Sequence, residues 1–159
     1  MDKLIEQLKV LQATAFSLYL KAHNFHWNVT GPNFADYHAF FGEFYAAVWA
    51  SVDLYAEHNR TLDTFVPGSL GRFSELSKIA DETNVPSAGA MFTKLAADNE
   101  TFLKELYVAH DIASAAKKYG IINFLDIDSE TKKTCGGIKR FGVRVVENEP
   151  AGIRNDAHV

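Results

Sequence analysis

The early part of the chain carries four side chains that commonly bind transition metals. His26 and His38 lie on either side of Gly31-Pro32, and Asp53 and Glu57 follow, four residues apart. Imidazole combined with carboxylate suits iron, manganese or zinc. The i, i+4 spacing places Asp53 and Glu57 on one face of a helix, whereas a helical hairpin that turns at Gly31-Pro32 would bring His26 to His38. These two pairs are the candidate metal ligands and, for a redox-active ion, the candidate catalytic residues.

The distance between the two pairs decides how many chains such a site needs. If His38 and Asp53 lie on one continuous helix, the fifteen residues between them span about 22 Å at about 1.5 Å per residue. No coordination sphere is that wide, so this helix cannot bring all the ligands to one ion. The economical arrangement is a two-fold dimer in which the histidines of one subunit face the carboxylates of the other.

Each of these residues also has a structural interpretation. A single histidine on an apolar face is usually a core residue with its hydrogen bonds satisfied, and an Asp/Glu pair at i, i+4 usually lies on a solvated surface. The residues around the carboxylates favour a metal, because Asp53 and Glu57 stand among Val52, Leu54 and Tyr55. An isolated pair of carboxylates would be costly to bury there without a cation.

Composition excludes several classes of protein. The 159 residues, 47% of them hydrophobic, are enough for one globular domain with its own core. The apolar runs are short and interrupted, which predicts no membrane span, and the start of the chain lacks the layout of a secretion signal, which predicts a cytoplasmic protein. The single cysteine, Cys135, allows neither an intrachain disulfide nor a multi-cysteine metal site.

Apolar residues recur at helical spacing through most of the chain. The pattern predicts two long helices joined at Gly31-Pro32, then a short connector helix and a third long helix, over residues 1–30, 33–60, 70–80 and 87–118. The supporting apolar stripes are Leu4, Leu8, Leu11, Ala15, Leu18 and Ala22; His38, Phe41, Tyr45, Val48 and Val52; Leu70, Phe73, Leu76 and Ile79; and Met91, Leu95, Phe102, Leu106, Ala109 and Ala113. Lys117, Lys118 and Gly120 are typical of a helix C-terminus and are expected to end the third long helix.

A fourth helix is expected after Gly120, because three helices would leave one apolar stripe partly uncovered. The apolar residues between Ile121 and Leu125 favour the start of such a helix. The chain then turns polar over residues 126–134, and the glycines and clustered valines of residues 136–146 oppose a helix. Residues 147–159 show no periodicity and are predicted to form a tail.

The motifs around the candidate ligands resemble those of a known family. The run from His26 to Phe34 reads HWNVTGPNF, His38 follows, and the run from Asp53 to Glu57 reads DLYAE. This is similar to the HWNVxGPxF, H and DxxAE motifs of the Dps family of mini-ferritins, and the resemblance covers residues 1–125. It implies an all-α fold, a ferritin-like four-helix bundle with a short helix in the connection between the second and third helices. The ferritin-like domain is expected over 1–146 with a tail at 147–159, and the C-terminal part of the fourth helix and the tail are atypical for the family.

The same resemblance implies a ferroxidase and iron-storage function that protects against oxidative damage. Fe(II) would bind the two histidines of one subunit and the two carboxylates of another. Hydrogen peroxide would oxidise it, and Fe(III) would be stored inside a hollow dodecamer built from two-fold dimers. Trp27 and Glu43 stand near the ligands and are candidates for supporting the site. Trp27 could intercept stray oxidising equivalents, or it could pack as an aromatic plug at the dimer interface.

Another function stays open. The chain could form a structural or nucleoid-binding shell whose metal site is idle or holds zinc as a substitute for iron. Strong DNA binding is not favoured, because the net charge of −4 gives no general attraction to phosphate. The presence of all four ligands favours the ferroxidase, since an idle site need not retain them.

Overall fold

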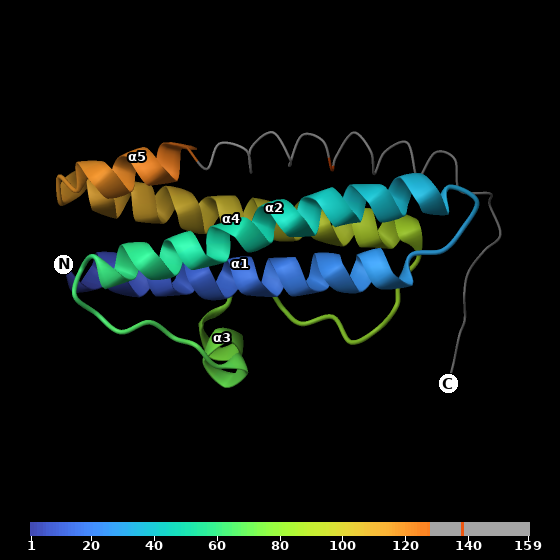
Figure 1. The fold of residues 1–159 in the computed structure, drawn as a ribbon, viewed down its shortest axis with the longest axis horizontal. Coiled ribbons are helices and arrows are strands. Elements are labelled where there is room, and N and C mark those ends of the chain that lie inside the picture. The colour runs from blue at the N-terminus through green and yellow to red at the C-terminus, as the bar shows by residue number, and fades with distance from the viewer. Residues whose placement is uncertain (128–137, 139–159) are drawn as a thin grey trace.

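A computed structural model describes residues 1–127 and Ile138, and every regular element in this part of the chain is a helix. The helices are α1 (Asp2–Asn28), α2 (Phe34–Arg60), α3 (Leu70–Leu76), α4 (Ala88–Ala115) and α5 (Tyr119–Ile127). Figure 1 shows α1, α2 and α4 as long, roughly aligned rods, with α5 lying beside α4. This confirms an all-α, ferritin-like four-helix bundle with a short helix between the second and third long helices.

Other expectations fall outside the described residues. The atypical C-terminal part of the fourth helix and the boundary between a domain at 1–146 and a tail at 147–159 concern residues beyond Ile127. Within the described range, no helix combines the length and the hydrophobicity needed to cross a membrane.

The hairpin between α1 and α2 forms where the sequence predicts it. Val29 caps α1 with an extended backbone, and Gly31 adopts a φ of 117°, a conformation that side chains with a Cβ rarely tolerate. The amide of Phe34 then donates to the carbonyl of Gly31, with an N to O distance of 3.1 Å. The chain reverses over these few residues, so the end of α1 and the start of α2 lie side by side.

The predicted stripes of the three long helices form the core. Every apolar residue of the α1 stripe is fully buried. Met91, Leu95 and Ala109 of α4 are at most 1% exposed. Between α2 and α4, the rings of Phe41 and Phe92 stack with their centroids 4.6 Å apart. These contacts hold α2 in a fixed position against the rest of the bundle.

The end of α4 differs from the prediction. The helix ends at Ala115, and Lys117 rather than Gly120 takes the left-handed backbone conformation, with a φ of 53°. The amide of Lys118 donates to the carbonyl of Ala113 at 3.0 Å, which closes the helix without a glycine. Gly120 lies inside α5, so the fourth helix begins earlier than expected.

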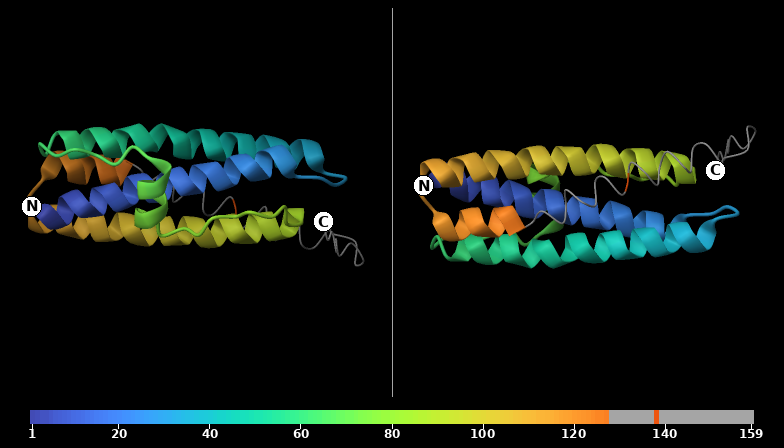
Figure 2. Two further views of the ribbon diagram at one scale, coloured as in Figure 1. Left: turned by 90° about the horizontal axis from the view of Figure 1, so that it is seen from below. Right: turned by 90° about the horizontal axis from the view of Figure 1, so that it is seen from above.

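The connector helix also differs from the prediction. It ends at Leu76 rather than near residue 80, none of its residues is buried, and Leu70 is 72% exposed. Figure 2 shows α3 lying across the outside of α1. Phe73 contacts Phe16 of α1, with ring centroids 4.7 Å apart, while Ile79 beyond the helix is buried. The stripe therefore faces a groove at the surface rather than the bundle core.

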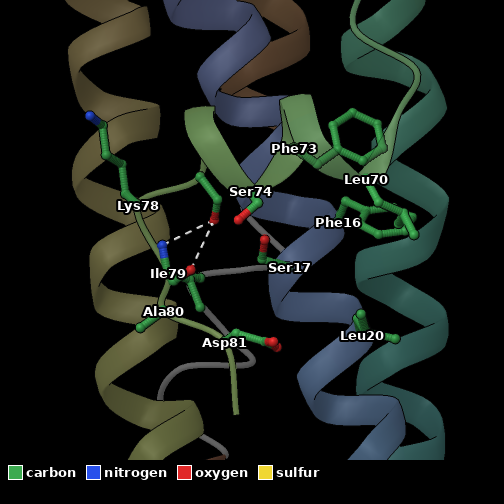
Figure 3. Close-up of a pocket in the computed structure, with 11 residues that line it drawn as sticks. Phe16, Ser17, Leu20, Leu70, Phe73, Ser74, Lys78, Ile79, Ala80 and Asp81 are labelled. Atoms are coloured by element: carbon green, nitrogen blue, oxygen red, sulfur yellow. Dashed lines mark hydrogen bonds between the residues drawn. The ribbon is translucent and has the colours of Figure 1, made fainter. Parts of the chain in front are cut away.

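Several large apolar side chains surround this groove, which has a volume of about 540 Å³. We call the apolar face the groove residues Phe16, Leu20, Leu70 and Phe73 together with Trp49, which lies outside the groove lining but has its ring centroid 6.4 Å from that of Phe16. Leu20 is 40% exposed and Trp49 is 52% exposed. Figure 3 shows Phe16, Leu20, Leu70 and Phe73 around the groove, drawn from α1 and from α3. Contiguous exposed apolar side chains of this size are typical of a protein interaction surface.

Candidate metal centre

The hairpin brings the two candidate histidines into direct contact. His26 lies in the last turn of α1 and His38 in the second turn of α2. Their rings stack with centroids 3.6 Å apart and planes 23° apart, and both side chains are half-buried. The spacing across Gly31-Pro32 thus produces the imidazole pair that the sequence predicts.

A reciprocal pair of hydrogen bonds orients the two rings. Nδ1 of His26 lies 2.7 Å from the carbonyl oxygen of His38, and Nδ1 of His38 lies 2.8 Å from the carbonyl oxygen of His26. A carbonyl can only accept, so each Nδ1 carries the hydrogen, and in the neutral imidazole the lone pair is then on Nε2. Donation from one ring nitrogen to a carbonyl is the usual support for a histidine that binds metal through the other nitrogen.

Gly42 makes room for this pair, and we did not identify it from the sequence. A Cβ placed on Gly42 would lie 3.3 Å from both Cε1 and Nδ1 of His26, closer than ordinary van der Waals contact. Glycine is unfavourable in the middle of a helix, and Gly42 stands in the middle of α2. The sequence signal is a residue that disfavours a helix, one turn after His38. It could have revealed that the imidazole of His26 packs closely against the backbone at this position.

We expect Gly42→Ala to weaken metal binding while leaving the fold intact. Alanine improves helix propensity by about 1 kcal/mol, but its methyl group displaces the imidazole of His26 from its carbonyl partner. Loss of such an orienting contact typically costs about 10-fold or more in metal affinity. Fe(II) titration and thermal unfolding measure the two effects. The matched control is Gly120→Ala, because a Cβ on Gly120 would meet nothing within 4 Å. Equal iron affinity in both variants would contradict the role of Gly42.

The two candidate carboxylates lie elsewhere on the molecule. Asp53 and Glu57 occupy the continuous helix α2 together with His38, which confirms the premise of the distance argument. Both are exposed, so the expected cost of burying them among apolar neighbours does not arise within one chain. In the described residues, no group of three or more His, Cys, Asp or Glu side chains is placed to hold a metal ion. A site with all four ligands would therefore need carboxylates from a second subunit.

The candidate supporting residues have different surroundings. Glu43 is exposed on α2 beside Gly42. Trp27 is 60% exposed, and its indole ring lies against His23, with ring centroids 3.9 Å apart. Trp27 is therefore neither a core residue nor a neighbour of the carboxylates in one chain.

His23 is the centre of a group of aromatic side chains that we name the aromatic strip. Its members, which were not recognised as a group from the sequence, are Tyr19, His23, Trp27, Tyr45 and Trp49. The ring of His23 stacks on that of Tyr45 with centroids 4.0 Å apart, and Nδ1 of His23 lies 3.2 Å from the hydroxyl of Tyr19. Burial lowers the pKa of His23, and the nearby imidazole of His26 lowers it further. Both effects favour the neutral form of His23.

His58, the neighbour of Glu57, faces away from the candidate ligands. Its ring stacks on Phe124 of α5 with centroids 4.1 Å apart. Burial lowers the pKa of His58, and the adjacent Glu57 carboxylate partly opposes that shift. His58 therefore helps to pack α2 against α5.

Comparison with known proteins agrees with the all-α fold. The family model of the ferritin-like domain matches residues 5–131. A DNA protection during starvation protein from Brevibacillus brevis is 35% identical over 109 residues, which cover 69% of this chain and 73% of that protein. The crystal structure of a Dps protein from Bacillus brevis has a TM-score of 0.84 at 30% identity, covering 88% of this chain and 95% of that chain. The crystal structure of Dps from Staphylococcus aureus has a TM-score of 0.84 at 27% identity, covering 89% of this chain and 95% of that chain.

Proposed function

The chain belongs to the Dps family of ferritin-like proteins, and on this premise we propose that it is an iron-binding mini-ferritin that oxidises Fe(II). The observation that carries the proposal is the reciprocal hydrogen bonding of His26 and His38, which leaves Nε2 of each neutral imidazole free to bind an ion in two stacked rings. Asp53 and Glu57 of the partner subunit would complete the site. The product, Fe(III), would be stored in the cavity of a hollow dodecamer.

The donor set suits a reaction in which iron is the substrate. Two neutral imidazoles bind Fe(II), while carboxylates stabilise the more highly charged Fe(III). With hydrogen peroxide as oxidant, two Fe(II) ions each give one electron, the O–O bond breaks, and two protons convert the products to water. No hydroxyl radical is released when both electrons are delivered. The reaction removes Fe(II) and peroxide together, which would protect the cell against oxidative damage.

The apolar face supports a two-fold dimer with this site. Trp49, the one member of the apolar face on α2, lies between His38 and Asp53. It stands four residues before Asp53, so Trp49 and the carboxylates share one stripe of the helix. A two-fold axis that passes through the middle of this stripe exchanges its two ends. A second copy seated there would place its carboxylates over the histidines of the first, and would cover the exposed Leu20 and Trp49.

Absorbance of ferric species after mixing Fe(II) with hydrogen peroxide tests the proposal. We expect the protein to accelerate the oxidation, to keep the ferric product in solution and to lower the yield of hydroxyl radical measured by spin trapping. Zn²⁺ added beforehand should inhibit the reaction, because two imidazoles and two carboxylates also suit zinc. Oxidation at the rate of protein-free buffer would instead favour a structural shell with an idle or zinc-occupied site. A gel shift at low salt would then show whether that shell binds DNA.

A further inference from the structure

An exposed aromatic ring lies just beyond the candidate carboxylates. Phe65, in the connection between α2 and α3, is 86% exposed. The guanidinium carbon of Arg60 lies 5.0 Å from the centroid of its ring, and Nη1 of Arg60 donates to the carbonyl of Thr64 at 2.7 Å. These contacts fold the connection back onto the last turn of α2. Phe65 is therefore held beside the end of this helix, with most of its ring in solvent.

The backbone also fixes this turn. Asp63 has a φ of 58°, and its amide donates to the carbonyl of Arg60 at 3.0 Å. Aspartate adopts this left-handed conformation more readily than most residues that carry a Cβ. The direction in which the chain leaves α2 is thus set by its own hydrogen bonds, and so is the position of Phe65.

Arg60 stands on the stripe of α2 that carries the candidate ligands. It follows Glu57 by three residues, a spacing at which two helical side chains share a face. At the other end of the stripe, Phe34 precedes His38 by four residues, and its ring stacks on that imidazole with centroids 5.0 Å apart. Phe34 is 45% exposed. Each end of the stripe therefore has an exposed aromatic ring about one turn outside a candidate ligand.

The two-fold dimer described above would bring these two ends together. When Glu57 of one subunit lies opposite His38 of the other, the two stripes run antiparallel. A residue three places after Glu57 then faces a residue three places before His38. Arg60, with the ring of Phe65 that it holds, therefore lies opposite Phe34. Contact between the two rings would remove apolar surface from water on both of them.

We propose that Phe65 of each subunit packs on Phe34 of the other and forms a lid over the shared metal centre. This inference rests on the proposed function for the dimer and its site. Phe34 already covers one side of the His38 imidazole, and the lid extends this cover across the subunit boundary. A bound ion must then leave past two packed rings, so its exchange with chelators in solution is slowed. Phe65 acts on access to the centre and does not bind the ion.

Cross-linking of the metal-free oligomer tests the contact without iron chemistry. Cys135→Ser removes the only cysteine of the chain, and Phe34→Cys and Phe65→Cys are then introduced together. A short bismaleimide should convert most of the protein to covalent dimers, and neither cysteine alone should do so. Phe34→Cys with Tyr119→Cys is the matched control, because Tyr119 is 73% exposed but lies on α5, which packs on the buried side of α2. Equal cross-linking of the two pairs, or none in the test pair, would overturn the proposal.

Release of a bound metal measures the effect of the lid. The oligomer is loaded with Co²⁺, whose visible absorption reports its ligands, and EDTA is added. Phe65→Ala should lose Co²⁺ about 2- to 10-fold faster, the range to which the energy of one aromatic contact corresponds. Phe65→Tyr keeps the ring and should restore the original rate, whereas Tyr119→Ala removes a similarly exposed ring elsewhere and should change nothing. An unchanged rate in Phe65→Ala would refute the lid.

These measurements separate failure of this inference from failure of the proposed function. Rapid iron oxidation without a cross-link between positions 34 and 65 would refute the lid alone. A cross-linked dimer that binds no Co²⁺ and oxidises no Fe(II) would refute the proposed function but support the contact between Phe34 and Phe65. Circular dichroism confirms that each variant keeps its helices.

Discussion

Two inactive variants should regain iron oxidation when they assemble together. One variant carries His26→Ala with His38→Ala, and the other carries Asp53→Ala with Glu57→Ala. Each alone should lose at least about 100-fold in Fe(II) oxidation, since even residues that only orient a ligand are worth 10- to 100-fold in metal affinity. If each site combines ligands from two subunits, a mixed dimer contains one site with all four ligands and one with none.

The expected recovery follows from counting sites. Random assembly of equal amounts makes half of the dimers mixed, and half of their sites are intact, so about a quarter of the original activity returns. The two chains are co-expressed with different tags and purified as mixed oligomers, and ferric absorbance is measured after addition of Fe(II) and peroxide. The control is a mixture of two separately assembled oligomers, each made of one variant only, in which no mixed dimers form. No recovery in mixed oligomers would exclude a site shared between subunits. Full activity in either variant alone would exclude its residues as ligands.

A charge placed on the apolar face should remove both the dimer and the activity. Leu20 borders the groove and is 40% exposed, so we expect a single chain with Leu20→Asp to fold. In a two-fold dimer the substitution occurs twice at one interface, and each buried carboxylate costs on the order of several kcal/mol. We expect light scattering to show a shift towards monomers and iron oxidation to fall with it. The helix content should stay unchanged.

Two matched variants control this experiment. Leu20→Met keeps an apolar side chain of similar volume and should preserve assembly and activity. Thr83→Asp adds the same charge at an exposed position in the connection before α4, away from the groove lining, and should also preserve both. A monomeric Leu20→Asp protein that oxidises iron at the full rate would refute the shared site, whereas an unchanged oligomer would show that this face does not form the interface.

The sequence predicted the helices well where their apolar spacing was regular. The stripe from Leu4 to Ala22 is buried throughout, and α2 begins and ends within the predicted limits. The spacing did not show what covers the stripe of the connector helix or how the third long helix ends. The stripe of α3 is regular, but in one chain it faces a groove on the surface, and Lys117 rather than a glycine reverses the chain after α4. A regular spacing shows which residues share a face but not what covers that face.

The sequence by itself predicted the helical hairpin, singled out the four candidate ligands and led us to propose a site shared between two chains, because these inferences depend on residue types and on distances along one helix. The tertiary structure alone decided the orientation of the two imidazoles, the space that Gly42 leaves for His26, and the hydrogen bond between Tyr19 and His23. The imidazole orientation and the space at Gly42 arise between α1 and α2, and the tyrosine–histidine bond depends on side-chain conformation. Neither helix packing nor side-chain conformation is encoded in periodicity, because both are set by the neighbours that folding brings together.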